Sequence, residues 1–370
     1  MRAITWSCLI GLGVALSGGG IAAAAWHGEA DPFFEMQEVY EGQRFPSIVV
    51  TTQGTVLAFR AQNAPIEVRR SEDGGETWGP IIEVGGGEAH LGAAVVDSES
   101  GDVMVFQGRR MFRSRDDGET WEEEEVTIEP DGFGGVGSTH GADSGITLRH
   151  GEHAGRLLIA ARVLGPEDDN AREWWPYHYN SAIYSDDGGS TWRTSHPFPV
   201  LGTGEGAVAE LSDGTIHYNS RIHMATDALR RVAWSEDGGH TWRNPAVAED
   251  LPDGPRGTYY GCMAGVVRLP LEDEDILIYS NLDEETDARQ GITVWASFDG
   301  GETWPVKRLV YEGPSAYSSL AVGRDDTPTE GLIYLQFEGG PGGMYSALQV
   351  ARFNLAWILD GEDLEGYLED

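Results

Sequence analysis

Short apolar runs separated by polar turns dominate this chain. The segments 47–59 (SIVVTTQGTVLAF), 93–106 (AAVVDSESGDVMVF), 207–220 (AVAELSDGTIHYNS) and 265–280 (GVVRLPLEDEDILIYS) each hold two β-rich runs around a polar or glycine-containing turn. Such pairs are typical of antiparallel hairpins. Nothing in the chain has the period of a long amphipathic helix. The pattern therefore predicts an all-β protein built from hairpins.

An eight-residue motif recurs between these hairpins. It appears as SEDGGETW (71–78), SRDDGETW (114–121), SDDGGSTW (185–192), SEDGGHTW (235–242) and SFDGGETW (297–304), at spacings of 43, 71, 50 and 62 residues. Repeats of roughly 40–50 residues are typical of β-propeller blades, and the longer intervals leave room for loop insertions or an unmarked blade. A propeller also protects its strand edges by closing on itself.

The carboxylates of the motif are the first candidates for chemistry. In the first copy they are Glu72, Asp73 and Glu76. Asp and Ser can bond to nearby backbone amides in a turn, glycine accepts positive φ, and a Trp ring fills the space between sheets. Five near-identical copies cannot share one active site, so we interpret these carboxylates as scaffold.

The first residues have the composition of a secretory signal. One basic residue precedes an apolar run that ends in small residues, which predicts a signal peptide over 1–25, although an uncleaved anchor helix is the alternative. The predicted mature chain then has a propeller over 26–360 and an acidic tail over 361–370, in a secreted or periplasmic protein. No later segment is apolar for the ~20 residues that span a bilayer. Cys8 lies inside the signal, so Cys262 has no partner for an intrachain disulfide.

Charge excludes one class of partner. The net charge is −36 and Lys307 is the only lysine, so we expect no nucleic-acid partner, because phosphate contacts need clustered cations. An acidic solvated surface explains the charge, and an acidic patch for a partner is the alternative.

The histidines are scattered without metal-ligand spacing and no phosphate-binding loop is present. We expect a monomer without metal or cofactor.

The repeated motif resembles the Asp boxes, S-x-D-x-G-x-x-W, of the sialidase (neuraminidase) superfamily. The segments 42–50 (GQRFPSIVV), 202–221, 287–304 and 332–340 (LIYLQFEGG) also resemble sialidase segments, in the family's order. The resemblance runs from about Arg44 to Leu359. It implies a six-bladed propeller of four-stranded antiparallel blades, and an exported exo-sialidase-like glycosidase that releases terminal sialic acid and retains the anomeric configuration.

The resemblance also implies roles for individual residues. The matching positions are a carboxylate-binding set (Arg44, Arg221, Arg289), a catalytic tyrosine and glutamate (Tyr317, Glu205), and Glu338, which braces the first arginine. Phe45 stands where the family has isoleucine. Guanidinium groups bind a carboxylate in a bidentate geometry that lysine cannot match. A neutral phenol avoids repulsion by the carboxylate of the sugar, but its pKa of about 10 makes it depend on a nearby base.

Several of these residues have ordinary alternatives. Each arginine could form a surface ion pair instead. Trp174, Trp175 and Tyr177 could line the pocket or pack an insertion onto the propeller. Tyr260 is a further candidate for the pocket, and His140, in a glycine-rich loop, is expected to have a surface role.

One departure from the family concerns the proton donor. The family carries an aspartate, its general acid and base, in the loop before the first Asp box. Here that span, 58–71 (AFRAQNAPIEVRRS), is short and has no aspartate; only Glu67 is acidic, in a strand-like setting. The sequence therefore leaves two further functions open. One is a sialic-acid-binding propeller with weak or no catalysis, and the other is a propeller glycosidase for another acidic sugar.

Overall fold

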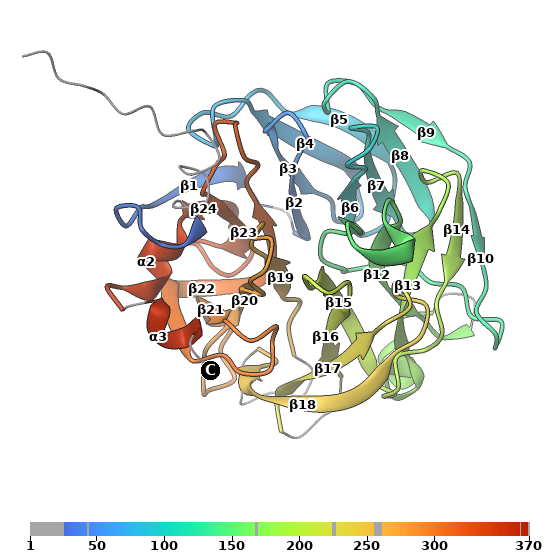
Figure 1. Cartoon of the computed structure of the whole chain (residues 1–370). Coiled ribbons are helices and arrows are strands. Elements are labelled where there is room, and N and C mark those ends of the chain that lie inside the picture. Colours follow the sequence, from blue (N-terminus) through green and yellow to red (C-terminus); the bar gives the residue numbers. More distant parts are fainter. Residues whose placement is uncertain are drawn as a thin grey trace, which may run out of the picture.

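The chain folds as a β-propeller, in which sheets surround a central axis (Figure 1). The computed structural model describes residues 26–42, 44–166, 169–223, 227–254, 261–362 and 364–368. The described part contains mainly strands and a few short helices: η1 (Gly151–His153), η3 (Arg172–Tyr177), α2 (Leu355–Leu359) and α3 (Glu365–Leu368). The all-β prediction is confirmed.

Four sheets follow one another along the chain. The first has β2 (Pro46–Val50), β3 (Val56–Arg60), β4 (Pro65–Ser71) and β5 (Ile82–Gly86). The second has β6 (Ala94–Val96), β7 (Val103–Gln107), β8 (Arg110–Ser114) and β9 (Glu122–Glu124). The third has β11 (Ile146–Thr147), β12 (Leu157–Val163), β13 (Tyr179–Ser185) and β14 (Thr191–Thr194), and β10 (Thr127–Glu129) joins β14 in parallel. The fourth has β15 (Thr203–Glu210), β16 (Ile216–Ile222), β17 (Leu229–Ser235) and β18 (Arg243–Pro252).

The fifth sheet has seven strands. It contains β19 (Gly265–Arg268), β20 (Leu277–Leu282), β21 (Gln290–Ser297), β22 (Val306–Val322), β23 (Ile333–Gly339), β24 (Ala347–Phe353) and β1 (Phe34–Glu41). The first half of β22 pairs with β21 and the second half pairs with β23. The expectation of six separate four-stranded blades therefore differs from the five sheets of the described residues, because β22 continues without a break between two sets of partners. At the end of this sheet, β1 pairs antiparallel with β24, with Phe34 opposite Phe353.

The innermost strands form a closed ring. Each innermost strand contacts the next one, in the order β2, β6, β11, β15, β19 and β22, and β22 contacts β2. The four hairpins expected from the apolar pattern are β2–β3, β6–β7, β15–β16 and β19–β20, so these predictions are confirmed. Because the ring is closed, residues at the starts of β2, β6, β11, β15 and β19 gather with the middle of β22 at one mouth of the central channel.

The repeated motifs are turns that use their own aspartate. Asp73 accepts hydrogen bonds from the Ser71 hydroxyl at 2.8 Å, the Thr77 amide at 2.9 Å and the Thr77 hydroxyl at 2.5 Å. Burial opposes ionisation, but these bonds outweigh it and lower the pKa of Asp73 to about 2. The same bonds recur in the other four copies, at Asp116, Asp187, Asp237 and Asp299. The scaffold interpretation is confirmed for the aspartate of each copy.

A layer of hydrogen bonds crosses the channel at Asp143. This buried carboxylate accepts a bond from the Ser319 hydroxyl at 2.6 Å and from the Val266 amide at 3.0 Å. The Asp143 amide donates to the Gly206 carbonyl at 3.0 Å. Burial raises the pKa of Asp143 to about 7, against the hydrogen bonds that lower it. The layer ties three innermost strands to the loop before β11.

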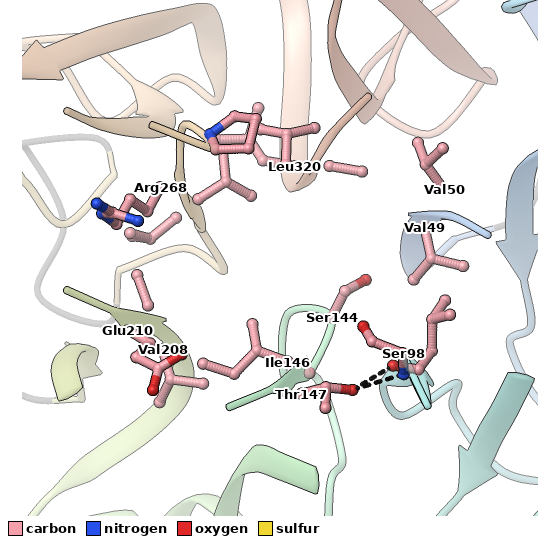
Figure 2. Close-up of a pocket in the computed structure, with 18 of the residues that line it drawn as sticks. Val49, Val50, Ser98, Ser144, Ile146, Thr147, Val208, Glu210, Arg268 and Leu320 are labelled. Atoms are coloured by element: carbon pink, nitrogen blue, oxygen red, sulfur yellow. Dashed lines mark hydrogen bonds between the residues drawn. The ribbon is translucent and has the colours of Figure 1, made fainter. Parts of the chain in front are cut away.

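Beyond this layer the channel opens into a cavity of about 150 Å³. Figure 2 shows Val49, Ile146, Val208 and Leu320 around it, with Arg268 at one side. These residues lie further along the innermost strands than the predicted site residues, and none of the predicted site residues lines the cavity. The cavity and the candidate site therefore occupy opposite ends of the channel.

The predicted signal peptide and the predicted acidic tail lie at the two ends of the chain. The predicted signal peptide, 1–25, lies outside the described residues. Within the predicted acidic tail, Leu364 is buried and the Tyr367 ring stacks on Phe298 at 4.8 Å between centroids. Helices in the described part of the chain are all too short or too polar to cross a membrane.

Candidate active site

Glu338 binds two of the predicted site residues, Arg44 and Tyr317. It is fully buried on β23 and accepts bonds from Arg44 Nε at 3.1 Å, the Phe45 amide at 2.9 Å and the Tyr317 amide at 3.2 Å. Phe45 has a φ of 63°, a left-handed conformation that is uncommon for a bulky residue. The bond to Glu338 holds this turn, so Arg44, just before β2, faces the middle of β22.

Tyr317 and Glu205 are bonded directly. The Tyr317 hydroxyl, on β22, donates to Glu205 Oε1 at 2.8 Å. Arg221 Nη1 donates to Tyr317 Oη at 2.9 Å and also to Glu205 Oε2. All three side chains are buried, at 7%, 4% and 3% relative exposure for Tyr317, Glu205 and Arg221. The phenol oxygen thus lies between an acceptor and a cationic donor.

The three predicted arginines surround the ring of Tyr317. The guanidinium carbons of Arg44, Arg289 and Arg221 lie 4.9, 5.6 and 5.9 Å from its centroid. Within the described residues, the hydrogen-bond partners of Arg289 are neutral: Nη1 donates to the Tyr345 hydroxyl at 3.2 Å and Nη2 to the Gly261 carbonyl at 3.1 Å. The Tyr345 ring also lies 4.0 Å from the Arg44 guanidinium, so this tyrosine orients two arginines.

Charges in the site place its proton on the phenol. Burial disfavours the ionised form of Glu205, but Arg221 and Arg162 outweigh it and lower the pKa of Glu205 to about 2. Burial and the charge of Glu205 raise the pKa of Tyr317 to about 12. Without a ligand, Glu205 is therefore ionised and Tyr317 is protonated.

The sequence did not reveal all the ionisable groups of the site. Arg162, on β12, is 2% exposed, and its Nη2 donates to the Asn170 side chain at 3.0 Å. The sequence offers one sign of its role, because Arg162 is a cationic residue within the apolar, buried run LLIAARV. His90 and His140 lie side by side, with ring centroids 4.8 Å apart. The expected surface role of His140 is wrong, because its ring lies against His90 and 5.9 Å from that of Phe45.

The insertion before the third Asp box reaches the edge of the site. Trp175, in η3, packs its ring on His223 at 4.7 Å, next to the strand that carries Arg221. Trp174 donates from Nε1 to Asp169 within the insertion, and Tyr177 is 66% exposed. Of the three aromatic candidates, Trp175 is therefore the one beside the site. Tyr260 lies outside the described residues.

Within the described residues, the buried Asp253 also acts on the charge of Arg221, but it is bound to Arg230 at 2.6 Å. Glu67 binds Arg60 at 2.6 Å, which is the structural role that its strand position indicated. No three His, Cys, Asp or Glu side chains within the described ranges are arranged to hold a metal ion. Cys262 is a buried free thiol, and burial raises its pKa to about 11.

The described geometry thus brings together all six side chains that the sequence singled out. The charged groups close to Tyr317 are four arginines (Arg44, Arg162, Arg221, Arg289) and two carboxylates (Glu205, Glu338). The four arginines outnumber the two carboxylates, so this group of side chains is positively charged and attracts an anion.

Comparison with known proteins points to one family. The family model of the BNR repeat-like domain matches residues 86–335. A sialidase of Micromonospora viridifaciens is 32% identical over 375 residues, covering 89% of this chain and 54% of that protein. A sialidase of Bacteroides fragilis is 26% identical, covering 79% of this chain and 59% of that protein. The chain thus spans little more than half the length of these two relatives.

Solved structures share the fold at low sequence identity. The intramolecular trans-sialidase of Ruminococcus gnavus in complex with oseltamivir carboxylate superposes with a TM-score of 0.64 at 16% identity, covering 85% of this chain and 95% of that one. The sialidase of Trypanosoma rangeli superposes with a TM-score of 0.63 at 16% identity, covering 90% and 61%. The repeats, the fold and the matched family model together show that this chain belongs to the sialidase superfamily of BNR-repeat proteins.

Proposed function

We propose that this protein is an exo-sialidase-like glycoside hydrolase that releases terminal sialic acid from glycoconjugates with retention of configuration. The observation that carries the proposal is the bond from Tyr317 to Glu205 within a ring of three arginines. Relatives named sialidases support the same chemistry.

We count the two halves of the seven-stranded sheet as separate blades, so that the propeller has six blades. We also propose that the protein is a monomer and that residues 1–25 direct its export.

The arginines would bind the carboxylate of the sugar. Arg289 has no carboxylate partner in the described residues, so an incoming anion breaks no ion pair there. Arg44 keeps Glu338 behind it, which fixes its direction. A carboxylate held by charge-assisted bonds from several guanidinium groups is fixed in position as well as bound. The anomeric carbon, which carries that carboxylate, would then lie over the Tyr317 hydroxyl.

Binding would also prepare the nucleophile. Because the pKa of Glu205 is lowered and that of Tyr317 is raised, proton transfer from Tyr317 to Glu205 in the free site is strongly unfavourable. Arg221 causes much of the low Glu205 value, since it donates to that carboxylate directly. A substrate carboxylate that takes over bonds of Arg221 would weaken this contact and make Glu205 a stronger base.

The reaction would then proceed in two steps. The Tyr317 oxygen attacks the anomeric carbon, its proton passes to Glu205, and the bond to the aglycone breaks as a general acid protonates the leaving oxygen. Water next attacks the same carbon and gives a proton to the conjugate base of that acid, the bond to Tyr317 breaks, and Glu205 returns its proton to the phenolate. Two displacements at one carbon retain the configuration.

Turnover of a fluorogenic aryl sialoside by the purified chain tests the proposal. Tyr317→Phe should lower kcat at least a hundredfold, whereas the matched control Tyr177→Phe, at an exposed ring, should not change it. The first product seen by proton NMR should be the α-anomer of sialic acid. Full activity of Tyr317→Phe would refute the tyrosine mechanism.

A sialic-acid-binding propeller is the second candidate. It is favoured by one observation: the turn between β3 and β4, residues 61–64, carries no carboxylic acid. Micromolar binding of a sialic-acid analogue without turnover of the aryl sialoside would select this function. A panel of aryl glycosides of uronic acids tests the remaining candidate, a glycosidase for another acidic sugar.

A further inference from the structure

The proposed reaction needs a proton donor that the two site carboxylates cannot supply. Cleavage of an unactivated glycoside needs a proton on the leaving oxygen. Glu205 is ionised and accepts bonds from Tyr317 and Arg221. Glu338 accepts bonds from Arg44 and from two backbone amides. Both carboxylates are thus occupied as acceptors, and the donor must be another group.

The short β3–β4 turn brings a histidine to the place beside Arg44. The Asn63 amide donates to the Ala89 carbonyl at 2.9 Å, and the Leu91 amide to the Ala61 carbonyl at 3.0 Å. Gln62 pairs with His90 in an isolated bridge. The turn thus binds the backbone of residues 89–91, and the His90 side chain remains half-buried.

The His90 ring lies one ring away from Tyr317. It packs on Phe45 at 4.4 Å between centroids, and Phe45 packs edge-on against Tyr317 at 5.4 Å. His90 is only partly buried. Within the described ranges its ring nitrogens have no hydrogen-bond partner, and neither is among the solvent-inaccessible unbonded atoms. Both nitrogens are therefore available to a ligand that reaches the exposed side of the ring.

The charges that face His90 come from several elements. They are Arg44 before β2, Arg162 on β12 and Glu205 on β15, and His140 lies against its edge. Burial, Arg44 and Arg162 lower the pKa of His90, while Glu205 raises it. Burial together with Arg162 and His90 lowers the pKa of His140 to about 3, so His140 stays neutral at working pH. A substrate carboxylate on Arg44 would offset one of the cations that disfavour protonated His90.

We propose that His90 is the proton donor and acceptor of the reaction that the proposed function assigns to this site. In the first step, protonated His90 gives its N–H proton to the glycosidic oxygen as the bond from that oxygen to the anomeric carbon breaks. In the second step, neutral His90 takes a proton from the attacking water as the bond to Tyr317 breaks. Each proton that His90 gives is recovered from water, so the cycle balances.

The test compares two leaving groups in four proteins. An aryl sialoside has a leaving oxygen of low pKa and needs little protonation, whereas sialyl-lactose needs a full proton transfer. The proteins are wild type, His90→Gln, His140→Gln and the control His153→Gln, whose histidine pairs with Glu152 away from the site.

His90→Gln should lower kcat/KM for sialyl-lactose by about 10²–10⁴-fold and change that for the aryl sialoside less than about threefold. In wild type, kcat/KM for sialyl-lactose should fall as pH rises through the lowered pKa of His90, and this limb should vanish in His90→Gln. Added imidazole should restore part of the lost rate. His140→Gln should affect both substrates alike, and His153→Gln neither.

The outcomes separate the inference from the function on which it rests. A wild type that cleaves both substrates, with equal losses on both or no loss in His90→Gln, overturns the role of His90 and leaves the glycosidase intact. A wild type that cleaves neither overturns the proposed function and the role of His90 with it. A wild type that cleaves only the aryl sialoside also overturns the role of His90, because the tyrosine pathway then works without a donor.

Discussion

Replacing Arg289 should separate ligand binding from folding. Its guanidinium group donates to the Tyr345 hydroxyl at 3.2 Å and the Gly261 carbonyl at 3.1 Å, and both acceptors are neutral. Arg289→Ala removes two such bonds, each contributing about 0.5–1.5 kcal/mol. We therefore expect the free energy of unfolding to fall by about 1–3 kcal/mol.

The loss in binding should be larger. A carboxylate that the site binds between its arginines loses a buried charged partner in Arg289→Ala, which costs about 3–5 kcal/mol, or about a hundredfold to a few thousandfold in affinity. Arg289→Lys keeps the charge without the planar fork, so its loss should be intermediate. Arg193→Ala is the matched control, since Arg193 pairs with Glu129 at the exposed surface.

Calorimetry with two ligands isolates the charge. One ligand is the 2,3-unsaturated analogue of sialic acid, and the other is its methyl ester, which has the same shape without the negative charge. Arg289→Ala should weaken binding of the acid by about a hundredfold to a few thousandfold, and binding of the ester only a few-fold. Equal losses for acid and ester, or a loss of less than threefold for the acid, would show that Arg289 does not bind the carboxylate.

Four further predictions follow from other parts of the structure. Glu338→Gln leaves the Tyr317 amide and Arg44 without a charged acceptor, so urea denaturation should show a loss of about 3–5 kcal/mol, and a loss below about 1 kcal/mol would contradict this role. The folded pKa of Asp143, about 7, lies above the unfolded value of about 3.9. Between these two pH values Asp143 is therefore protonated in the folded state and ionised in the unfolded state. Stability should fall on the order of 2–4 kcal/mol as pH rises from about 4 to about 7, and Asp143→Asn should abolish the slope; an unchanged slope would point to another group. Cys262 should react with iodoacetamide at pH 8 only after denaturation, and rapid alkylation of the native protein would contradict its burial. With a net charge of −36 and an anionic substrate, kcat/KM should rise between about 0.01 and 0.15 M salt as the Debye length falls from about 30 to 8 Å, and a steady fall would refute long-range repulsion.

The sequence predicted those parts of the fold that local patterns determine. Each hairpin is encoded by two apolar runs and its own turn, and each Asp box closes on its own serine, aspartate and threonine. These interactions span few residues, so they can be recognised without knowing the rest of the structure. The unbroken β22 could not be recognised, because the position where a strand exchanges partners depends on the strands beside it.

The candidate site was predictable only where a motif marked it. Tyr317 and Glu205 are 112 residues apart, and the family resemblance alone placed them together. His90 and Arg162 carry no motif, and they reach the site because the ring of strands closes. Their importance depends on neighbouring charges from other blades, which a sequence pattern does not contain.

The pairing of β1 with β24 has a consequence for the order in which the protein is made. The Phe33 amide binds the Asn354 side chain across 321 residues of chain, so β1 leaves the ribosome long before its partner β24. At about 5–20 residues per second, β1 waits roughly 15–60 s for that partner during translation. An unpaired strand is a template for wrong association during this time. Glu35, Glu38 and Glu41 give β1 like charges, which disfavour the pairing of two nascent copies before the ring closes.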